Sequence, residues 1–169
     1  MAVKVVRGSV LTNSLNYKLA AGQTIAKGDL VRITSAGTIK IAVGTTATAG
    51  AVHGIALKNG ATTAVAATET VGAGELFPIA VINADTILAM QLPAATDFDA
   101  LGTTGRGLLA TFTPTTQAQR LIDAVTSGVL RIVGVPSDDQ SFNPDDSDTT
   151  DGGWVYVTVE QSVLVGRAA

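Results

Sequence analysis

The apolar residues of this chain occur in short runs, and this feature constrains the fold more than any other. The runs are rich in Val, Ile and Leu, and clusters of Gly, Asn, Asp, Ser and Thr separate them. This pattern is typical of short strands joined by turns. The sequence therefore predicts strands at residues 30–34, 38–42, 52–57, 75–82, 86–92, 129–135 and 154–159.

Two pairs of these strands are expected to form hairpins. The first joins residues 30–34 to 38–42 through a three-residue loop that ends in glycine. The second joins residues 75–82 to 86–92 through the turn at 83–85. Short loops of this kind connect neighbouring antiparallel strands.

Residues 114–125 have two interpretations. Thr113 and Pro114 suit the start of a helix, and apolar residues recur at helical spacing after them. The alternative is a strand over residues 120–125, which would match the strand at 38–42 in the first half of the chain.

The two halves of the chain resemble each other at a spacing of about 80 residues. Glycines that precede apolar strands recur 79 or 80 residues apart. The matched pairs are Gly28 and Gly107, Gly54 and Gly134, and Gly74 and Gly153. We therefore expect two half-repeats, at residues 20–98 and 99–169.

Each half alone would bury too little apolar surface to be stable, so both are expected to build one core. Eight or more short strands then predict an all-β fold, either a closed barrel or a two-sheet sandwich. Residues 1–19 contain several apolar side chains but have no counterpart in the repeat. We expect them to form an extended N-terminal arm ahead of a single β domain at residues 20–169.

The chain supplies few reactive groups. It has no Cys and a single His, its formal charge is −3, and only 15% of its residues are charged. Neither a phosphate-binding glycine pattern nor a Gly-x-Ser-x-Gly nucleophile turn occurs. We therefore expect no enzymatic activity, cofactor, metal, nucleic acid or membrane partner, and a structural role for His53.

An Asp-rich loop at residues 138–151 leaves one alternative open. Asp146 and Asp148 have the spacing of the first two ligands of a calcium-binding loop, but Val157 stands where the closing Glu would be. We expect a solvated surface loop here, with a looser calcium site as the alternative.

The order of turns and strands over residues 20–92 is distinctive. It runs Lys27-Gly28-Asp29 before a strand, then His53-Gly54-Ile55-Ala56, then Gly74-Glu75 before a further strand. This order resembles the capsid decoration (cement) proteins of tailed bacteriophages, in which a Gly-Asp strand precedes a Gly-Ile/Val-Ala strand and a Gly-Glu strand. The second half departs from that pattern, because Leu108 follows Gly107 where the family would have Asp.

The resemblance implies a structural protein that is made in the host cytoplasm and sits on the outer surface of the virion. It implies binding to the major capsid protein and self-association, with a trimer as the expected state. The N-terminal arm would then add a strand to a neighbouring subunit or to the capsid. The residues expected to make these contacts are Val3, Val5, Arg7, Leu11, Leu15 and Tyr17.

A second hypothesis is a glycan- or cell-surface-binding module, such as a head fibre or a lectin-like β-sandwich. Such sites usually stack sugars on exposed aromatic rings, and only 4% of this chain is aromatic. Trp154 opens a predicted strand beside the Asp-rich loop. It is therefore the residue expected to recognise a surface under this hypothesis.

Overall fold

Strands and turns make up the part of the chain that the structure describes. The structure is a computed structural model, and it describes residues 3–7, 15–44, 51–61, 76–91, 107–113, 121–125, 128–134 and 154–160. These residues contain no helix, and so none that could cross a membrane, and their strands confirm the all-β prediction. The strands are β1 (Val3–Arg7), β2 (Leu15–Leu19), β3 (Thr24–Ile25), β4 (Leu30–Ile33), β5 (Thr38–Ile41), β6 (Gly54–Ala56), β7 (Gly60–Ala61), β8 (Leu76–Val81), β9 (Ile87–Gln91), β10 (Leu109–Phe112), β11 (Leu121–Val125), β12 (Leu130–Gly134) and β13 (Trp154–Val159).

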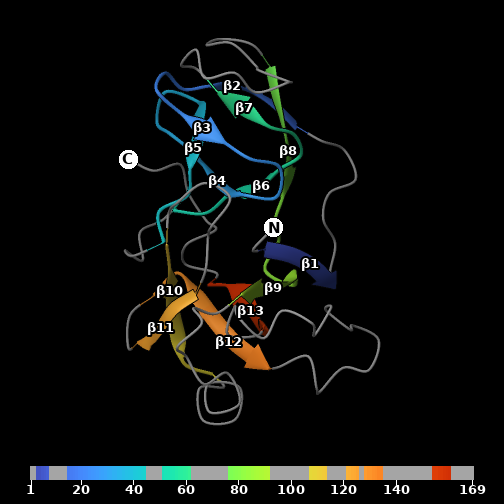
Figure 1. Ribbon diagram of the computed structural model, residues 1–169, viewed down its shortest axis with the longest axis vertical. Helices are drawn as coiled ribbons and strands as arrows, with labels where there is room; N and C mark the ends of the chain where they lie inside the picture. Colours follow the sequence, from blue (N-terminus) through green and yellow to red (C-terminus); the bar gives the residue numbers. More distant parts are fainter. Residues whose placement is uncertain are drawn as a thin grey trace.

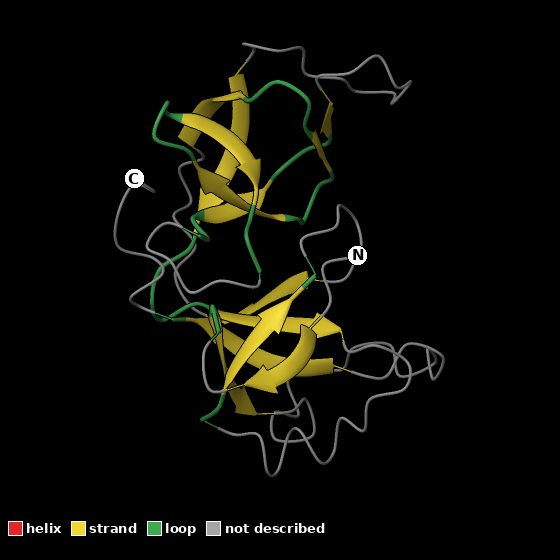
Figure 2. Ribbon diagram, turned by 90° about the vertical axis from the view of Figure 1, so that its left-hand side faces the viewer, coloured by secondary structure: helices red, strands yellow, loops and turns green. Residues whose placement is uncertain are grey.

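The strands form two units that are stacked along the long axis of the molecule (Figures 1 and 2). In the upper unit of Figure 1, five strands close into a barrel in the order β2-β5-β4-β6-β8. In the lower unit, six strands form an open sheet in the order β1-β9-β13-β12-β10-β11. A short ribbon of β3 and β7 accompanies the barrel. The closed barrel is one of the two architectures that the sequence predicts.

The first predicted hairpin is confirmed. β4 and β5 are antiparallel neighbours, with Val31 opposite Ile41. The Thr34 amide donates to the Thr38 carbonyl at 2.8 Å across the turn. Gly37 lies in this turn with a φ of 73°, a backbone conformation that glycine adopts without steric cost.

The second predicted hairpin is wrong, although both of its strands are present. β8 lies in the barrel between β2 and β6, whereas β9 lies in the open sheet between β1 and β13. The turn exists: the Thr86 amide donates to the Asn83 carbonyl at 3.1 Å, and the Asn83 amide donates to the Thr86 hydroxyl at 3.2 Å. It carries the chain from one unit to the other, because β8 already has a neighbour on each side.

The strand interpretation of residues 120–125 is confirmed for the part that the structure describes. β11 covers Leu121–Val125 and pairs with β10. Residues 114–120 lie outside the described residues. The strands predicted near 52–57, 129–135 and 154–159 are present as β6, β12 and β13.

The described N-terminal residues differ from the expected arm, because both of their strands pair within the chain. β1 is antiparallel to β9, and Val3, opposite Met90, is only 3% exposed. β2 pairs with β8 on one side and with β5 on the other, and it thereby closes the barrel. These pairings satisfy backbone groups that an arm in solvent would leave to water.

The two units repeat one strand order. The barrel runs β2-β8-β6-β4-β5, and the open sheet contains the series β9-β13-β12-β10-β11. Neighbouring strands are antiparallel throughout both series. The equivalent series therefore begin at β2 and β9, ahead of the boundaries at residues 20 and 99 that the sequence comparison suggests.

Equivalent hydrogen bonds extend the repeat to single residues. The Gly28 amide donates to the Ala56 carbonyl at 2.8 Å, and the Gly107 amide donates to the Ile132 carbonyl at 2.8 Å. Both glycines have a positive φ, 93° for Gly28 and 81° for Gly107. The match of these two glycines in the sequence is thus also a match in structure.

The sequence match of Gly54 with Gly134 is displaced by four residues from the structural match, in which Leu130 is the equivalent of Gly54. Gly54 lies opposite Val31 in the barrel, and Leu130 lies opposite Ala110 at the same place in the open sheet. Gly134, the expected counterpart of Gly54, stands at the end of β12 beyond an irregularity in its pairing with β13. The chain from Ala110 to Leu130 is shorter than the chain from Val31 to Gly54, so a match at constant spacing does not align these structural equivalents.

One apolar core joins the two units, and a second fills the barrel. The shared core contains buried residues from both units: Leu30, Val52, Ile55 and Ile82 on the barrel side, and Leu88, Met90, Phe112, Leu130, Ile132, Val155 and Val157 on the sheet side. The barrel core is built by Leu19, Ile25, Val31, Ile33, Ile39, Ala56, Phe77 and Ile79. The shared core fixes the barrel on the sheet.

Candidate functional site

The outer surface of β2 and β8, with the chain after β6, presents apolar and basic side chains together. Phe77 belongs to the barrel core, so the alternation of a strand directs Leu76 and Pro78 outward. Lys18 lies opposite Leu76 across the strand pair. The Leu57 amide donates to the Pro78 carbonyl at 3.1 Å, which places Leu57 on the other side of β8.

Two leucines on this surface remain in solvent. Leu76 is 61% exposed and Leu57 is 39% exposed, although burial of a leucine contributes about 1.5–3 kcal/mol to a fold. Lys58 follows Leu57 in the chain, and the Lys27 amide donates to Asn59 Oδ1 at 2.8 Å, which brings Lys27 to the same bend.

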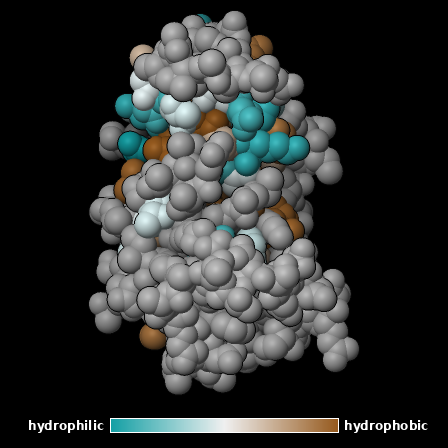
Figure 3. All heavy atoms as spheres, viewed as in Figure 1, coloured by the Kyte–Doolittle hydropathy of each residue, from teal (hydrophilic) through white to brown (hydrophobic). Residues whose placement is uncertain are grey.

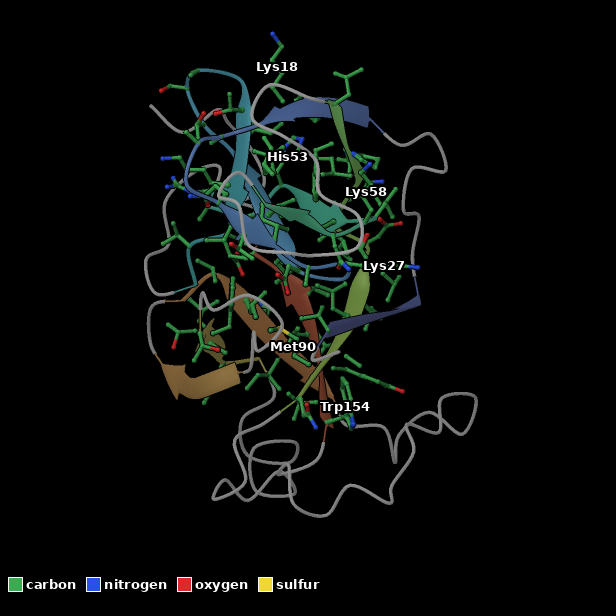
Figure 4. All side chains as sticks on the ribbon, turned by 45° about the horizontal axis from the view of Figure 1, so that its top comes forward. Lys18, Lys27, His53, Lys58, Met90 and Trp154 are labelled. Atoms are coloured by element: carbon green, nitrogen blue, oxygen red, sulfur yellow. The ribbon has the colours of Figure 1, made fainter. Side chains whose placement is uncertain are left out.

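We call this surface the lysine–leucine face, and its members are Lys18, Lys27, Leu57, Lys58 and Leu76. Figure 4 labels its three lysines around the barrel. In Figure 3, hydrophilic and hydrophobic residues adjoin over the upper unit, which is the barrel. The combination suits a protein partner, because apolar side chains contribute to the interior of an interface and charges to its rim.

The described part of the barrel is basic. Its charged residues are Lys18, Lys27, Arg32, Lys40 and Lys58, against a single carboxylate, Asp29. Asp29 is 4% exposed, so the described barrel presents lysines to solvent without an exposed carboxylate beside them. The whole chain has a formal charge of −3. The described part of the barrel is therefore basic, whereas the chain as a whole is acidic, and a basic surface of this kind is complementary to an acidic one.

Asp29 serves the turn ahead of β4. Its amide donates to the Ala26 carbonyl at 3.0 Å, and its Oδ2 accepts from the Ala26 amide at 2.8 Å. Gly28 supplies the positive φ that such a turn requires. The equivalent position in the open sheet is Leu108, which is 46% exposed. The Gly-Asp motif thus stabilises the turn ahead of β4, and the equivalent turn of the open sheet lacks this carboxylate.

His53 lies where the chain enters β6. Its amide donates to the Val31 carbonyl at 2.7 Å, and its ring meets the Tyr17 ring edge to face, with centroids 6.0 Å apart. Its Nε2 is buried and has no hydrogen-bond partner among the described residues. Burial lowers the pKa of His53 below its ordinary value because the charged ring loses solvation. A neutral ring packed against an aromatic neighbour fits the structural role that the sequence predicts.

The residues predicted to contact a capsid or a second subunit lie in different environments. Val3 is buried in the shared core, Val5 is 42% exposed, and Tyr17 is partly buried against the barrel core. Arg7 and Leu15 lie in paired strands, β1 and β2. The structure therefore does not bring these residues together on one arm.

Trp154 opens β13, opposite Gln91, and is half-buried. Tyr156, two residues further along, is 6% exposed. Figure 4 shows Trp154 in the unit away from the labelled lysines. An exposed pair of rings for sugar stacking is thus not formed by these two side chains, and glycan recognition by Trp154 stays a prediction.

Two of the predicted features cannot be placed, because Leu11 and the Asp-rich loop at 138–151 lie outside the described residues. Within the described ranges, no group of three or more His, Cys, Asp or Glu side chains is arranged to hold a metal ion. The calcium alternative for the loop stays a prediction.

Sequence reasoning missed the lysine–leucine face because its members are scattered along the chain and meet only when the barrel closes. A separate charge count for each unit is the signal that could have found it. Residues 15–81 hold five basic and three acidic residues, whereas residues 82–169 hold four basic and eleven acidic ones. This asymmetry in charge between the two stretches is visible in the sequence before any strand is paired.

Comparison with known proteins identifies no relative of this chain. The chain matches no protein-family model, and neither a curated protein nor a solved structure is detectably similar to it.

Proposed function

We propose that this protein is a non-enzymatic structural protein that decorates the outer surface of a tailed-phage capsid, and that its lysine–leucine face binds the major capsid protein. The observation that carries the proposal is the exposure of Leu57 and Leu76 among three lysines on a barrel whose described carboxylate is buried. An apolar patch rimmed by charge marks an interaction site.

The resemblance to decoration proteins supports the same assignment. The Gly-Asp and Gly-Ile motifs that carry it both lie in the barrel, at the start of β4 and in β6. The rigid barrel presents the face on strands, which hold side chains in place better than loops do. Individually weak contacts then gain strength from many copies on a lattice.

Co-sedimentation tests the proposal. Undecorated shells assembled from the major capsid protein of the same phage are mixed with the protein at increasing concentration, and bound protein is measured in the pellet. We expect saturable binding that weakens as NaCl is raised from 50 to 500 mM, because exposed charges are screened. Absence of binding at saturating protein would contradict the proposal.

Charge-reversal variants locate the contact. Lys18→Glu combined with Lys58→Glu is expected to lower the affinity for shells at least tenfold, because two attractive charges become repulsive. Each of the two changes is also made alone, and Lys40→Glu is the matched control for the single variants: it reverses one charge on β5, where Lys40 lies opposite Arg32. Equal losses from the control and from the single variants would place the contact elsewhere on the protein.

A further inference from the structure

The outer face of the β4–β5 hairpin carries two basic side chains directly opposite each other, Arg32 and Lys40. Val31, Ile33 and Ile39, their neighbours along the strands, belong to the barrel core. The alternation of a strand therefore directs both basic side chains away from that core. Side chains that are directly opposite have Cβ atoms about 4.5–5.5 Å apart, and like charges at this spacing destabilise a sheet. An anion bound between the two charges would remove this repulsion.

Two threonine hydroxyls lie on the same face of the hairpin. Thr34 and Thr38 are each two residues away from one member of the basic pair, so they share its side of the strands. Their Oγ1 atoms are 2.8 Å apart, which confirms that side chains of this face meet across the hairpin. The contact uses one of the two hydroxyl hydrogens. The other has no hydrogen-bond partner among the described residues and is left as a donor.

The hydrogen bonds of Arg32 differ from those of Arg131, the other arginine whose side chain the structure describes. Arg131 Nε and Nη2 contact Glu160 Oε2 at 3.0 and 2.9 Å, and Arg131 Nη1 donates to the Gly107 carbonyl at 2.6 Å. Arg32 Nε is buried, and no nitrogen of the Arg32 guanidinium has a hydrogen-bond partner among the described residues. Arg32 therefore has unused donors of the kind that carboxylate and phosphate oxygens accept.

The place of Arg32 in the hairpin explains why only part of its guanidinium is buried. At one end of this face, the Ala42 amide donates to the Leu30 carbonyl at 3.0 Å, and both residues belong to the shared core. At the other end, the turn at residues 35–37 is exposed. Arg32 lies between the two and is half-buried. Its stem and Nε are thus held in place, while its terminal nitrogens remain accessible to a ligand.

The described residues supply no counter-ion for this pair. Neither Arg32 nor Lys40 takes part in an ion pair there. Asp29, the carboxylate of the described barrel, is only 4% exposed. Lys18 lies beside Thr38 in the neighbouring strand and adds a third positive charge. An oxyanion with two negative charges matches two unpaired cations and a hydroxyl donor, because each of its oxygens accepts hydrogen bonds.

We propose that the β4–β5 hairpin binds a doubly charged tetrahedral oxyanion, either a phosphate ion or a phosphate monoester. The Arg32 guanidinium and the Lys40 ammonium bind its oxygens, and a hydroxyl of Thr34 or Thr38 donates to it. This site goes beyond the proposed function. It is tested without capsid shells, so each proposal can fail alone.

Titration of the full chain with phosphate tests the site by ¹H–¹⁵N NMR at pH 7.5. Phosphate is raised to about 50 mM while chloride is adjusted to keep the ionic strength constant, which removes differences in charge screening. We expect saturable shifts at the amides of Arg32, Thr34, Thr38 and Lys40. The Arg32 Nε–H signal should shift as well. Saturation separates a site from the general stabilisation that excluded salts cause.

Substitutions assign the contacts. Arg32→Gln and Lys40→Gln should each lower the phosphate affinity at least fivefold. Arg32→Lys keeps the charge but loses the planar set of donors, so it should lower the affinity at least threefold. Arg131→Gln is the matched control, because it removes an arginine that is already paired with Glu160, and it should leave the affinity unchanged. Circular dichroism checks each fold. Should Arg32→Gln unfold the chain, Lys40→Gln decides.

A second titration with glycerol 3-phosphate distinguishes the two sources of the oxyanion. An affinity equal to or above that of inorganic phosphate identifies a phosphate monoester as the ligand, and a lower affinity identifies the free ion. Two results would overturn the inference. One is the absence of saturable shifts in the hairpin with either compound. The other is an affinity that Arg32→Gln and Lys40→Gln leave unchanged.

Discussion

The carbonyl of Gly44 accepts a 3.0 Å hydrogen bond from the amide of Phe112, and this bond links the chain after β5 to β10 of the other unit. Gly44 is buried, and a Cβ at its position would overlap the carbonyl of Phe112. The junction of the two units therefore depends on the absence of a side chain at this residue.

Gly44→Ala should destabilise the protein by about 1–3 kcal/mol, because overpacking shifts backbone that has no room to move. Denaturant unfolding measures the loss, and hydrogen exchange at the Phe112 amide should become faster. Gly22→Ala is the comparison: its Cβ meets nothing within 4 Å, although its φ is 69°. That variant should cost stability through backbone strain and leave protection of the Phe112 amide in place.

Asp29→Ala should cost about 1–3 kcal/mol, because the buried Ala26 amide loses the carboxylate that accepts its hydrogen bond. Leu108→Ala changes the equivalent position of the other unit, where the side chain is exposed, and should change the free energy of unfolding by less than about 0.5 kcal/mol. Urea denaturation measures the free energy of unfolding of both variants. Similar values for the two variants would refute the structural role of the Gly-Asp turn.

His53 should make the protein less stable as the pH falls. Its pKa is lowered in the folded state, so between its ordinary value near 6.5 and the folded value the unfolded chain binds the extra proton. The free energy of unfolding should therefore decline as the pH is lowered through about 6.5. His53→Gln should remove this part of the slope between pH 7 and 5, and an unchanged slope would show that His53 does not contribute.

Val3→Ala should destabilise the chain by about 2 kcal/mol, since Val3 is buried against the shared core. Val5→Ala makes the same change two residues away in the same strand, where the side chain is 42% exposed. It should cost well under about 1 kcal/mol. Thermal unfolding of both variants measures the difference. If residues 3–7 were a solvent-exposed arm, neither substitution would change the unfolding temperature.

Trp154→Ala tests the glycan hypothesis. Under that hypothesis the variant loses binding on a glycan array while its oligomeric mass stays that of the unchanged chain. Under the capsid-binding proposal, neither the unchanged chain nor the variant binds a glycan; Trp154 is half-buried and Tyr156, two residues further along β13, is buried. Saturable binding that disappears with the ring would favour the recognition module over capsid decoration.

Local patterns predicted seven of the thirteen described strands, namely β4, β5, β6, β8, β9, β12 and β13, because alternation and turn residues act over a few positions. The hairpin around Gly37 is an example, since its partners are neighbours in the chain. The partners of β8 and β9 could not be inferred in the same way. A turn at residues 83–86 is compatible both with a β8–β9 hairpin and with a passage between the two units. Because β2 and β6 occupy both sides of β8 in the closed barrel, β9 pairs in the open sheet instead.

The candidate site was harder to predict than the fold. Lys18 and Leu76 are separated by most of the barrel in sequence, and they become neighbours through the pairing of β2 with β8. Val3 illustrates the opposite error: without a visible partner it suggested an arm, yet its partner Met90 lies far along the chain. Pairings of this kind join segments that are distant in the sequence, and no pattern of neighbouring residues predicts them.

The place of β1 in the open sheet has a consequence for how the chain is made. β1 leaves the ribosome before the barrel, but β9, its partner, follows only after all the described strands of the barrel have been synthesised. Domains tend to fold as they emerge from the ribosome. The barrel can therefore be folded while β1 still lacks its partner β9. β1 thus pairs late although it is made early, because its place in the open sheet is formed only when β9 has been synthesised.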